Sequence, residues 1–410
     1  MATTTSSIIN LTKTIVGAGL LAIPFAFKAN GILFGILLIL LGGIAAWYGL
    51  YIVARVSDHI EGETSFFALC AITYPKLTLL FDFSIAIQCF GVALSYLVLF
   101  GDLVPSLIGE YLTRNQVIVM SLVFIVPLIS FRRLDSLKFG SLVGLIAIAY
   151  LTLLVLGHAL FDDLSLTRGE LRVIRPGPLS EVLSAFSIVV FAFTAAQNIC
   201  TIINEIDDKR KVNWVIIASC LGAGILFTVV GLAGYLQFGS NITGNVILNY
   251  DPTLITSRIG KSALTLMVGL SFPLMFHPCR ISINNMIHWI ETELNKEKQG
   301  ETRPLLSSDN NNNNDDVERS HVEVPFSTNR FIAVTVILCT VIYLLALSVT
   351  SFELVLALVG ATGSTLICFI LPGLFGYKLL ETPRERYMSL ALTIWGTAVM
   401  IAAVFATLRY

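Results

Sequence analysis

Apolar residues recur along the chain in runs close to the length of a membrane-crossing helix. An α-helix needs about 20 residues to cross a hydrocarbon core about 30 Å thick. Divided at its charged and Pro/Gly-rich stretches, the hydropathy pattern predicts eleven spans. Their expected bounds are 6–29, 32–55, 78–101, 116–131, 139–161, 181–204, 213–237, 259–281, 330–351, 354–378 and 387–408. The pattern therefore predicts an all-α polytopic membrane protein whose single transmembrane domain covers residues 1–410.

Two segments between these spans are too polar to cross a bilayer. Residues 57–75 are expected to hold a short interfacial helix around SFFALCAIT. Residues 291–328 include a run of five asparagines and cannot bury enough apolar area to order themselves. We therefore predict a disordered loop over 291–328.

Composition supports many spans rather than one anchor. Hydrophobic residues make up 55% of the chain and charged residues 13%, about half the ~25% of an ordinary soluble domain. A net charge of −1 with no concentrated basic face argues against a nucleic-acid partner. The first residues carry no basic region typical of a removable signal peptide. The seven cysteines lack metal-binding or redox spacing, so we expect them to pack as small apolar side chains.

The distribution of Lys and Arg among the short loops predicts the orientation. Basic residues gather at 132–138, 209–211 and 378–386, which fall on one side of the bilayer. This bias predicts a cytosolic N-terminus and a C-terminus on the opposite, non-cytosolic side. Asn241, in an Asn-Ile-Thr glycosylation acceptor, would then lie on the non-cytosolic side.

The 291–328 loop would face the cytosol in this orientation. Its ETRPLL segment matches an acidic dileucine sorting signal that a cytosolic adaptor could bind. Such six-residue patterns also arise by chance. The residues that define the match are Glu301, Leu305 and Leu306.

The first span carries three residues that disfavour a helix in the middle of the membrane. Gly17 and Gly19 each cost about 1 kcal/mol of helix stability and Pro24 costs about 3 kcal/mol. We expect a broken helix, although a helix kinked against small neighbours is the alternative. Unwound backbone persists in a membrane only where it is buried in protein or lines a cavity. Its free N–H groups, at the N-terminus of a half-helix, would suit a carboxylate.

Polar residues mark two further spans. The sixth carries Thr194, Gln197 and Asn198 at mid-depth, five spans after the first, as an inverted repeat would place a second broken helix. The same side chains could instead hydrogen-bond between helices. In the eighth span two prolines flank His277, a candidate proton site or a packing residue, with Ser271 one to two turns earlier.

Lys13 lies one turn before the expected break in the first span. An ammonium in hydrocarbon is costly, so Lys13 should face the protein interior or water. The alternative is a lysine that snorkels to the cytosolic interface.

Four motifs resemble those of the amino acid/auxin permease family, in the right order and across nearly the whole chain. They are NLTKTIVGAGLLAIPFAF, FAFTAAQNICTIINEI, SFPLMFHPCR and LVGATGSTLICFILPG. GDLVPSL, ILNYDP and the short N-terminal tail are most similar to fungal vacuolar amino-acid transporters of the exporting type. The resemblance implies a LeuT-like fold of about eleven helices in the vacuolar membrane. Its parts would be a first inverted repeat over 6–161, a second over 181–378 and an eleventh helix over 387–408.

The resemblance also implies a substrate site at the two breaks. The carboxylate and amine of an amino acid would meet backbone and side chains of Val16, Gly17, Ala18, Gly19, Phe193, Thr194 and Gln197. None of these residues is acidic or basic, and a charged substrate side chain would need a counter-ion. Neutral amino acids are therefore the expected substrates.

One departure from the family pattern bears on ion coupling. Sodium-coupled relatives carry an asparagine in the first span where this chain has Lys13, and a hydroxyl in the eighth span that Ser271 matches. An ammonium in that cation site would replace sodium and could exchange its proton. The hypothesis is proton coupling or facilitated exit, with Lys13 as the internal cation, Ser271 as its partner, and no cofactor. Proton symport from an acidic lumen would deliver amino acids to the cytosol.

Other functions remain open on the sequence. A plasma-membrane importer or a non-transporting amino-acid sensor would share these motifs. A membrane-embedded enzyme is disfavoured because the spans contain no HExxH motif, paired aspartates or Ser-His pair.

Overall fold

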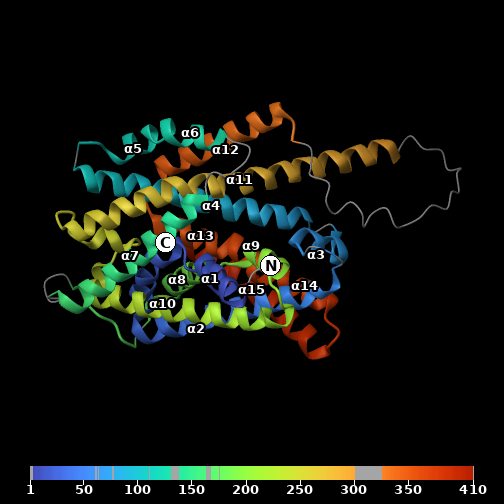
Figure 1. The fold of residues 1–410 in the computed structure, drawn as a ribbon, viewed down its shortest axis with the longest axis horizontal. Coiled ribbons are helices and arrows are strands. Elements are labelled where there is room, and N and C mark those ends of the chain that lie inside the picture. The colour runs from blue at the N-terminus through green and yellow to red at the C-terminus, as the bar shows by residue number, and fades with distance from the viewer. Residues whose placement is uncertain are drawn as a thin grey trace, which may run out of the picture.

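The computed structural model describes residues 3–60, 62, 64–75, 78–109, 111–130, 138–162, 168–174, 176–300 and 326–409. All elements in this part of the chain are helices, and the longer ones run roughly side by side along the longest axis of the molecule (Figure 1). Their bounds are α1 Thr4–Ile15, α2 Ile23–Val56, α3 Phe66–Thr73, α4 Thr78–Ile108, α5 Arg114–Met120, α6 Leu122–Ser130, α7 Lys138–Phe161, α8 Leu179–Ala192, α9 Ala196–Glu205, α10 Val212–Phe238, α11 Ile255–Gly300, α12 Thr328–Ser348, α13 Phe352–Val359, α14 Leu371–Leu379 and α15 Pro383–Leu408.

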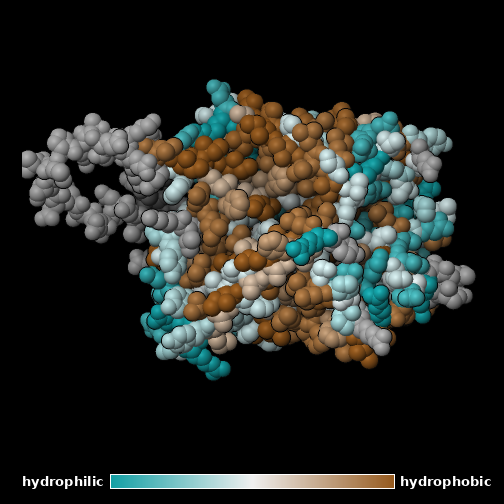
Figure 2. Space-filling view, turned by 180° about the vertical axis from the view of Figure 1, so that it is seen from behind, coloured by the Kyte–Doolittle hydropathy of each residue, from teal (hydrophilic) through white to brown (hydrophobic). Residues whose placement is uncertain are grey.

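The surface carries the pattern of a membrane protein. Figure 2 shows a broad hydrophobic band across the middle of one face of the molecule and hydrophilic residues towards its two ends. Within the described residues, eight helical segments are long and apolar enough to cross a bilayer. Arg114–Ser130 and Leu179–Ala192 are shorter apolar segments. The prediction of an all-α polytopic membrane protein is confirmed.

The first two predicted spans share one long helix. α2 begins within the first span and continues to Val56, with a single non-helical residue at Gly31, which has φ 71°. A left-handed φ of this kind favours glycine. The backbone N–H of Ile32 donates to the carbonyl of Arg172 across this point, at 3.0 Å. The predicted boundary between residues 29 and 32 is thus a tight kink rather than a loop.

α11 extends further than the sequence pattern predicted. The eighth span was expected at 259–281, and the loop over 291–328 was expected to be disordered, but α11 continues to Gly300. Residues 291–300 are rich in Glu, Lys and Gln, which are good helix formers. The Glu291 carboxylate also accepts a hydrogen bond of 2.6 Å from Arg330 at the start of α12. Residues 301–325, with the sorting match at Glu301, Leu305 and Leu306, lie outside the described residues.

Two other predicted segments take a different form from a plain helix, and a third is found as expected. The fourth span consists of α5 and α6, which meet at Ser121. The tenth span runs from α13 through two π-helical stretches, η9 (Gly360–Ser364) and η10 (Leu366–Ile370), into α14. The helix expected around SFFALCAIT is present as α3, and the Ser65 side chain accepts a hydrogen bond from Ala68 N–H at its start.

The interrupted helices occupy the centre of the bundle. In Figure 1, α1, α8 and α9 lie in the middle, with α4 and α11 on one side and α2 and α10 on the other. The two places where helices are interrupted are therefore enclosed by protein. This is the environment that unwound backbone requires inside a membrane.

Candidate functional site

The first interruption follows α1 and is made from backbone alone. Val16 has φ −82° and ψ 73°, the geometry of an inverse γ-turn, and the Gly17 N–H donates to the Ile15 carbonyl at 2.9 Å. A short 3₁₀ helix, η1 (Ala18–Leu21), then leads into α2. The glycines and Pro24 produce the break that the sequence predicted.

The second interruption separates α8 from α9. Phe193, Thr194 and Ala195 leave the helix, and Ala195 adopts φ −136° and ψ 4°. The Thr194 N–H bonds back to the Phe191 carbonyl at 3.0 Å, which closes the end of α8. This break occurs without a glycine or proline.

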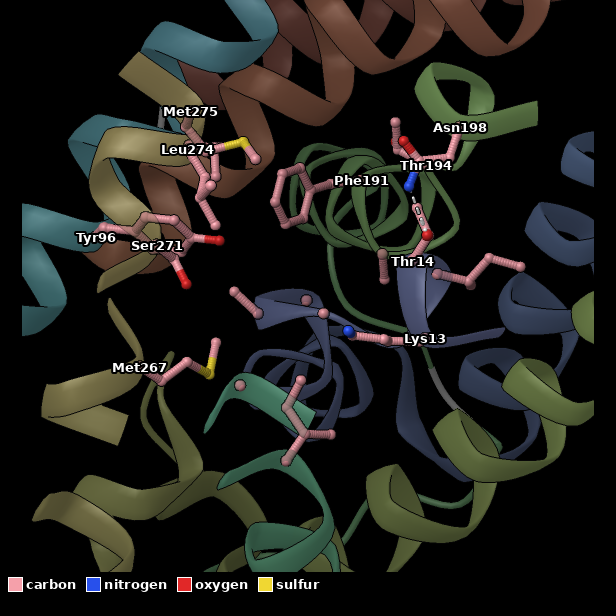
Figure 3. Close-up of a pocket in the computed structure, with 18 of the residues that line it drawn as sticks. Lys13, Thr14, Tyr96, Phe191, Thr194, Asn198, Met267, Ser271, Leu274 and Met275 are labelled. Carbon is pink, nitrogen blue, oxygen red and sulfur yellow. Dashed lines mark hydrogen bonds between the residues drawn. The ribbon is translucent and has the colours of Figure 1, made fainter. Parts of the chain in front are cut away.

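The two interruptions lie against each other. A methyl group added to Gly19 would be 2.7 Å from the Cα of Ala192, so only a glycine allows this approach. On the far side of the breaks, the Asn198 side-chain amide donates to the Thr14 hydroxyl at 2.8 Å, a bond visible in Figure 3. Helix ends of both polarities, two N-termini and two C-termini, therefore meet at one place.

A cavity of about 290 Å³ opens beside these breaks (Figure 3). Pockets for drug-sized ligands range from about 300 to 1,000 Å³, so this volume suits a small ligand. It is lined by Asn10, Lys13, Thr14, Ile15, Gly17, Ala18, Gly19, Gln88, Val92, Tyr96, Gly144, Leu145, Ile148, Phe191, Ala192, Thr194, Asn198, Met267, Ser271, Leu274 and Met275.

The cavity reaches the surface at one end. Asn10, Leu145 and Asn198 line that end and are exposed. At the other end Phe191 is 8% exposed and Gln88 is 2% exposed. The opening therefore lies towards the end of the bundle where α1 begins and α9 finishes.

Most of the residues predicted for the site line this cavity. Gly17, Ala18, Gly19 and Thr194 do so at the breaks. Lys13 from α1 and Ser271 from α11 also line it, on opposite sides of the open space in Figure 3. No hydrogen bond joins Lys13 to Ser271 in the described part of the chain.

The remaining three predicted residues lie elsewhere or are not described. Val16 is buried behind the cavity wall, and the side chain of Gln197 lies outside the described part of the structure. Phe193 points away from the cavity and packs edge-on against Phe227, with ring centroids 5.1 Å apart. It lines a separate apolar groove of about 530 Å³ between α2 and α10, because the chain turns as it leaves α8.

Sequence reasoning missed the wall that α4 contributes. Gln88, Val92 and Tyr96 line the cavity from successive turns of α4. Their spacing of four residues places them on one face of a helix. The signal was present as a glutamine and a tyrosine eight residues apart, on one face of the span, but the sequence could not show which element packs against that face.

Charge in the cavity is confined to Lys13. Of the described lining residues, only Lys13 is basic and none is acidic. Lys13 makes no ion pair or hydrogen bond with any residue that the structure describes. Its ammonium can therefore be reached from the cavity, as Figure 3 shows.

A second cavity of about 530 Å³ adjoins the first. Asn198, Leu274 and Met275 line both. Its outer wall includes Thr64 and Asn204, which form a reciprocal pair of hydrogen bonds. Thr64 N–H donates to the Asn204 side-chain oxygen at 2.8 Å, and the Asn204 amide donates to the Thr64 carbonyl at 2.9 Å.

The chain matches a known family over nearly its full length. The model of the family described as "Transmembrane amino acid transporter protein" covers residues 1–409.

Similar proteins in yeast match over almost the whole of both chains. Vacuolar amino acid transporter 7 of Saccharomyces cerevisiae is 40% identical, over 98% of this chain and 97% of its own. Vacuolar amino acid transporter 6 of the same yeast is 37% identical, over 98% of each chain. Vacuolar amino acid transporter 5 of Schizosaccharomyces pombe is 36% identical, over 97% of this chain and 92% of its own.

Proposed function

The chain belongs to the family of transmembrane amino acid transporter proteins, and from this premise we propose that it exports neutral amino acids from the vacuole lumen to the cytosol. In this proposal transport is coupled to protons and is independent of sodium. Membership of the family makes the chain a transporter rather than an enzyme. One observation carries the finer proposal: a small cavity at two helix breaks, with a single ammonium and no described carboxylate in its lining.

The helix breaks are suited to the two charges that every free amino acid carries. N–H groups at the start of η1 and α9 present partial positive charge, and carbonyls at the ends of α1 and α8 present partial negative charge. The substrate carboxylate would bind at Ala18 and Gly19, whose N–H groups bond to no backbone carbonyl in the described chain. Its amine would bind the carbonyl ends, next to Thr194.

The lining supports a neutral substrate side chain. A cationic side chain would need a carboxylate partner, and none lines the cavity in the described residues. The ammonium of Lys13 already fixes one positive charge beside the break. We assign it to proton exchange, with Ser271 facing it across the cavity.

The arrangement of the breaks also supports the proposed LeuT-like fold. Two interrupted helices that meet at the middle of a bundle are what inverted repeats over 6–161 and 181–378 would produce. The eleventh helix, predicted at 387–408, corresponds to α15.

The vacuolar location and the orientation rest on the relatives and on charge. The yeast relatives are named as vacuolar transporters. The basic loops support a cytosolic N-terminus and a lumenal C-terminus. Asn241 is exposed, as a glycan acceptor must be. The sorting signal at Glu301, Leu305 and Leu306 stays a prediction.

Uptake into liposomes tests the function. Purified protein is reconstituted, a pH gradient is imposed with and without sodium, and a panel of radiolabelled amino acids is supplied. We expect proton-driven, sodium-insensitive uptake that is lost in Lys13→Ala and kept in Lys211→Ala, a matched change of an exposed lysine that does not line the cavity. A Lys13→Asn variant restores the residue of sodium-coupled relatives and should respond to sodium.

Three results would contradict the proposal. Sodium-dependent uptake by the wild type excludes Lys13 as the substitute cation. Specific binding without transport under any gradient indicates a sensor. A tagged protein found at the plasma membrane indicates an importer.

A further inference from the structure

Gln88 is a buried amide in the wall of the central cavity. It lies on α4 within an apolar run and is 2% exposed. A buried carboxamide without partners costs free energy, so its hydrogen bonds indicate its role. The residue was not among those predicted for the site.

Among the described residues, a hydrogen-bond partner is found for the oxygen of this amide but not for its nitrogen. The Ser364 hydroxyl donates to Gln88 Oε1 at 2.9 Å, and Ser364 is itself fully buried in the π-helical stretch η9. The neighbouring Gly363 lies so close that an added methyl group would be 2.9 Å from the same oxygen. The tenth span therefore fixes the carbonyl end of the side chain.

The amide nitrogen is left facing the cavity. It has no hydrogen-bond partner among the described residues, and Gln88 lines the cavity. The side chain consequently presents two N–H donors to a ligand.

The surroundings of this donor are mostly apolar. Val92 lies one turn further along α4, and Met267, Leu274 and Met275 come from α11. The helix breaks that suit a substrate's main-chain charges form the other wall. A substrate held at the breaks would direct its side chain towards α4 and α11.

We propose that Gln88 determines substrate specificity by donating a hydrogen bond to an acceptor on the substrate side chain. Neutral amino acids with a side-chain carbonyl, glutamine and asparagine, are then preferred over apolar ones of similar size, methionine and leucine. A site built to hydrogen-bond its ligand rejects analogues that leave its polar group unpaired. This inference rests on the proposed function, because it assigns the side-chain end of the same site.

Binding selectivity of purified protein tests this role without requiring transport. Unlabelled glutamine and methionine compete with radiolabelled glutamine, and the ratio of their affinities is compared between variants. We expect the wild type to favour glutamine by about tenfold, equivalent to about 1.4 kcal/mol. In Gln88→Met the ratio should fall to about one, with methionine bound as well as before. Ser364→Ala, which keeps the amide but frees it to turn, should give an intermediate ratio.

Further variants guard against a purely structural effect. Gln88→Leu also removes the amide and should likewise lose the preference, so the test does not depend on whether Gln88→Met folds. Gln116→Met, a matched change at the start of α5 away from the cavity, should leave the ratio unchanged. Tyr96→Phe removes a different polar group, a hydroxyl, on the same face of α4 and should leave most of the preference in place.

The outcomes separate this inference from the proposed function. An unchanged ratio in Gln88→Met, equal weakening of both ligands, or loss of the preference in Tyr96→Phe alone overturns the role of Gln88 while amino-acid transport can still stand. The expected ratios without transport would support the role of Gln88 and overturn transport. A wild type that binds methionine as tightly as glutamine also overturns the inference.

Discussion

The close contact between the two helix breaks depends on the absence of a side chain at one glycine. Gly19 allows the chain to approach Ala192 closely, whereas a methyl group on Gly17 would find its nearest neighbour, the Thr14 carbonyl oxygen, 3.9 Å away. The two glycines are separated by one residue but meet different surroundings. From the sequence alone, the two glycines were expected to contribute equally to the helix break.

Gly19→Ala should therefore damage the protein more than Gly17→Ala. The new methyl group must push η1 and α8 apart, and overpacking of this kind costs about 1–3 kcal/mol. We expect a lower melting temperature and a loss of uptake for Gly19→Ala, with a smaller change for Gly17→Ala. Equal effects of the two changes on stability and uptake would contradict the close packing of the breaks.

Asp251 stabilises the turn before α11. Its carboxylate accepts hydrogen bonds from the N–H and the hydroxyl of Thr253, at 2.8 and 2.7 Å, and these hold its pKa below the ordinary value of 3.8. A pKa that is depressed in the folded state contributes stability above the unfolded pKa. That contribution is lost as the pH falls through the folded pKa.

The Asp251→Ala variant should lower the melting temperature equally at pH 7 and pH 5, because the carboxylate is ionised at both. The difference from the wild type should shrink only below about pH 3.8. Thermal unfolding across this pH range measures it. A difference that stays constant as the pH falls below about 3.8 would show that this pKa is not depressed.

The sequence predicted some of the residues that line the cavity and missed others. Lys13 and the glycines could be predicted as site residues because a charge or a helix break inside a membrane segment costs free energy and is therefore a sign of function. The role of Gln88 could not be predicted, because it depends on a hydrogen bond with Ser364, which lies 276 residues away in the sequence. Phe193 was expected in the cavity, and its outward direction depends on how the chain turns after α8.

At the scale of elements, the two interrupted helices differ in how much their sequence revealed. Gly17, Gly19 and Pro24 predict the first break locally. The second has no breaker at Phe193–Ala195, so only its position as a repeat of the first suggested it. The extension of α11 was missed because polarity was interpreted as disorder, whereas Glu and Lys also favour an exposed helix.

The half-helix α9 is held at its outer end by Asn204. The two hydrogen bonds between Asn204 and Thr64 join α9 to the segment before α3, beside the second cavity. Losing both would leave backbone groups unpaired, at a cost of about 1–3 kcal/mol. The position of α9 thus depends on a contact far from the breaks.

Asn204→Ala should loosen α9 and expose Cys200, which lines the second cavity and is 8% exposed. We expect faster labelling of Cys200 by a thiol reagent, measured by mass spectrometry. Cys220 on α10 provides the internal control, since it does not line this cavity. Equal acceleration at both cysteines would indicate general unfolding instead of a local release.

At the scale of the whole molecule, hydropathy determined the class of fold and charge suggested its orientation. The apolar band in Figure 2 has the form expected of a bilayer-spanning bundle. The basic loops at 132–138, 209–211 and 378–386 predict which end faces the cytosol. Composition alone could not indicate how the spans pack or where a cavity forms between them.

Protease protection in intact vacuoles tests the orientation. An epitope tag at the N-terminus should be removed by protease added outside, whereas a tag after residue 410 should survive until detergent is added. A mobility shift on glycosidase treatment that is absent in Asn241→Gln would place the 239–249 segment in the lumen. Protection of the N-terminal tag would reverse the assignment.

Three residues that line the cavity, Asn10, Leu145 and Asn198, are exposed, so the cavity is open beside them. A ligand that enters from that end stabilises this conformation over any other that it cannot reach. In the proposed orientation that end faces the cytosol, into which the proposed export would deliver amino acids. If the chain exports amino acids as proposed, a high cytosolic concentration of its substrate should therefore slow further export from the vacuole.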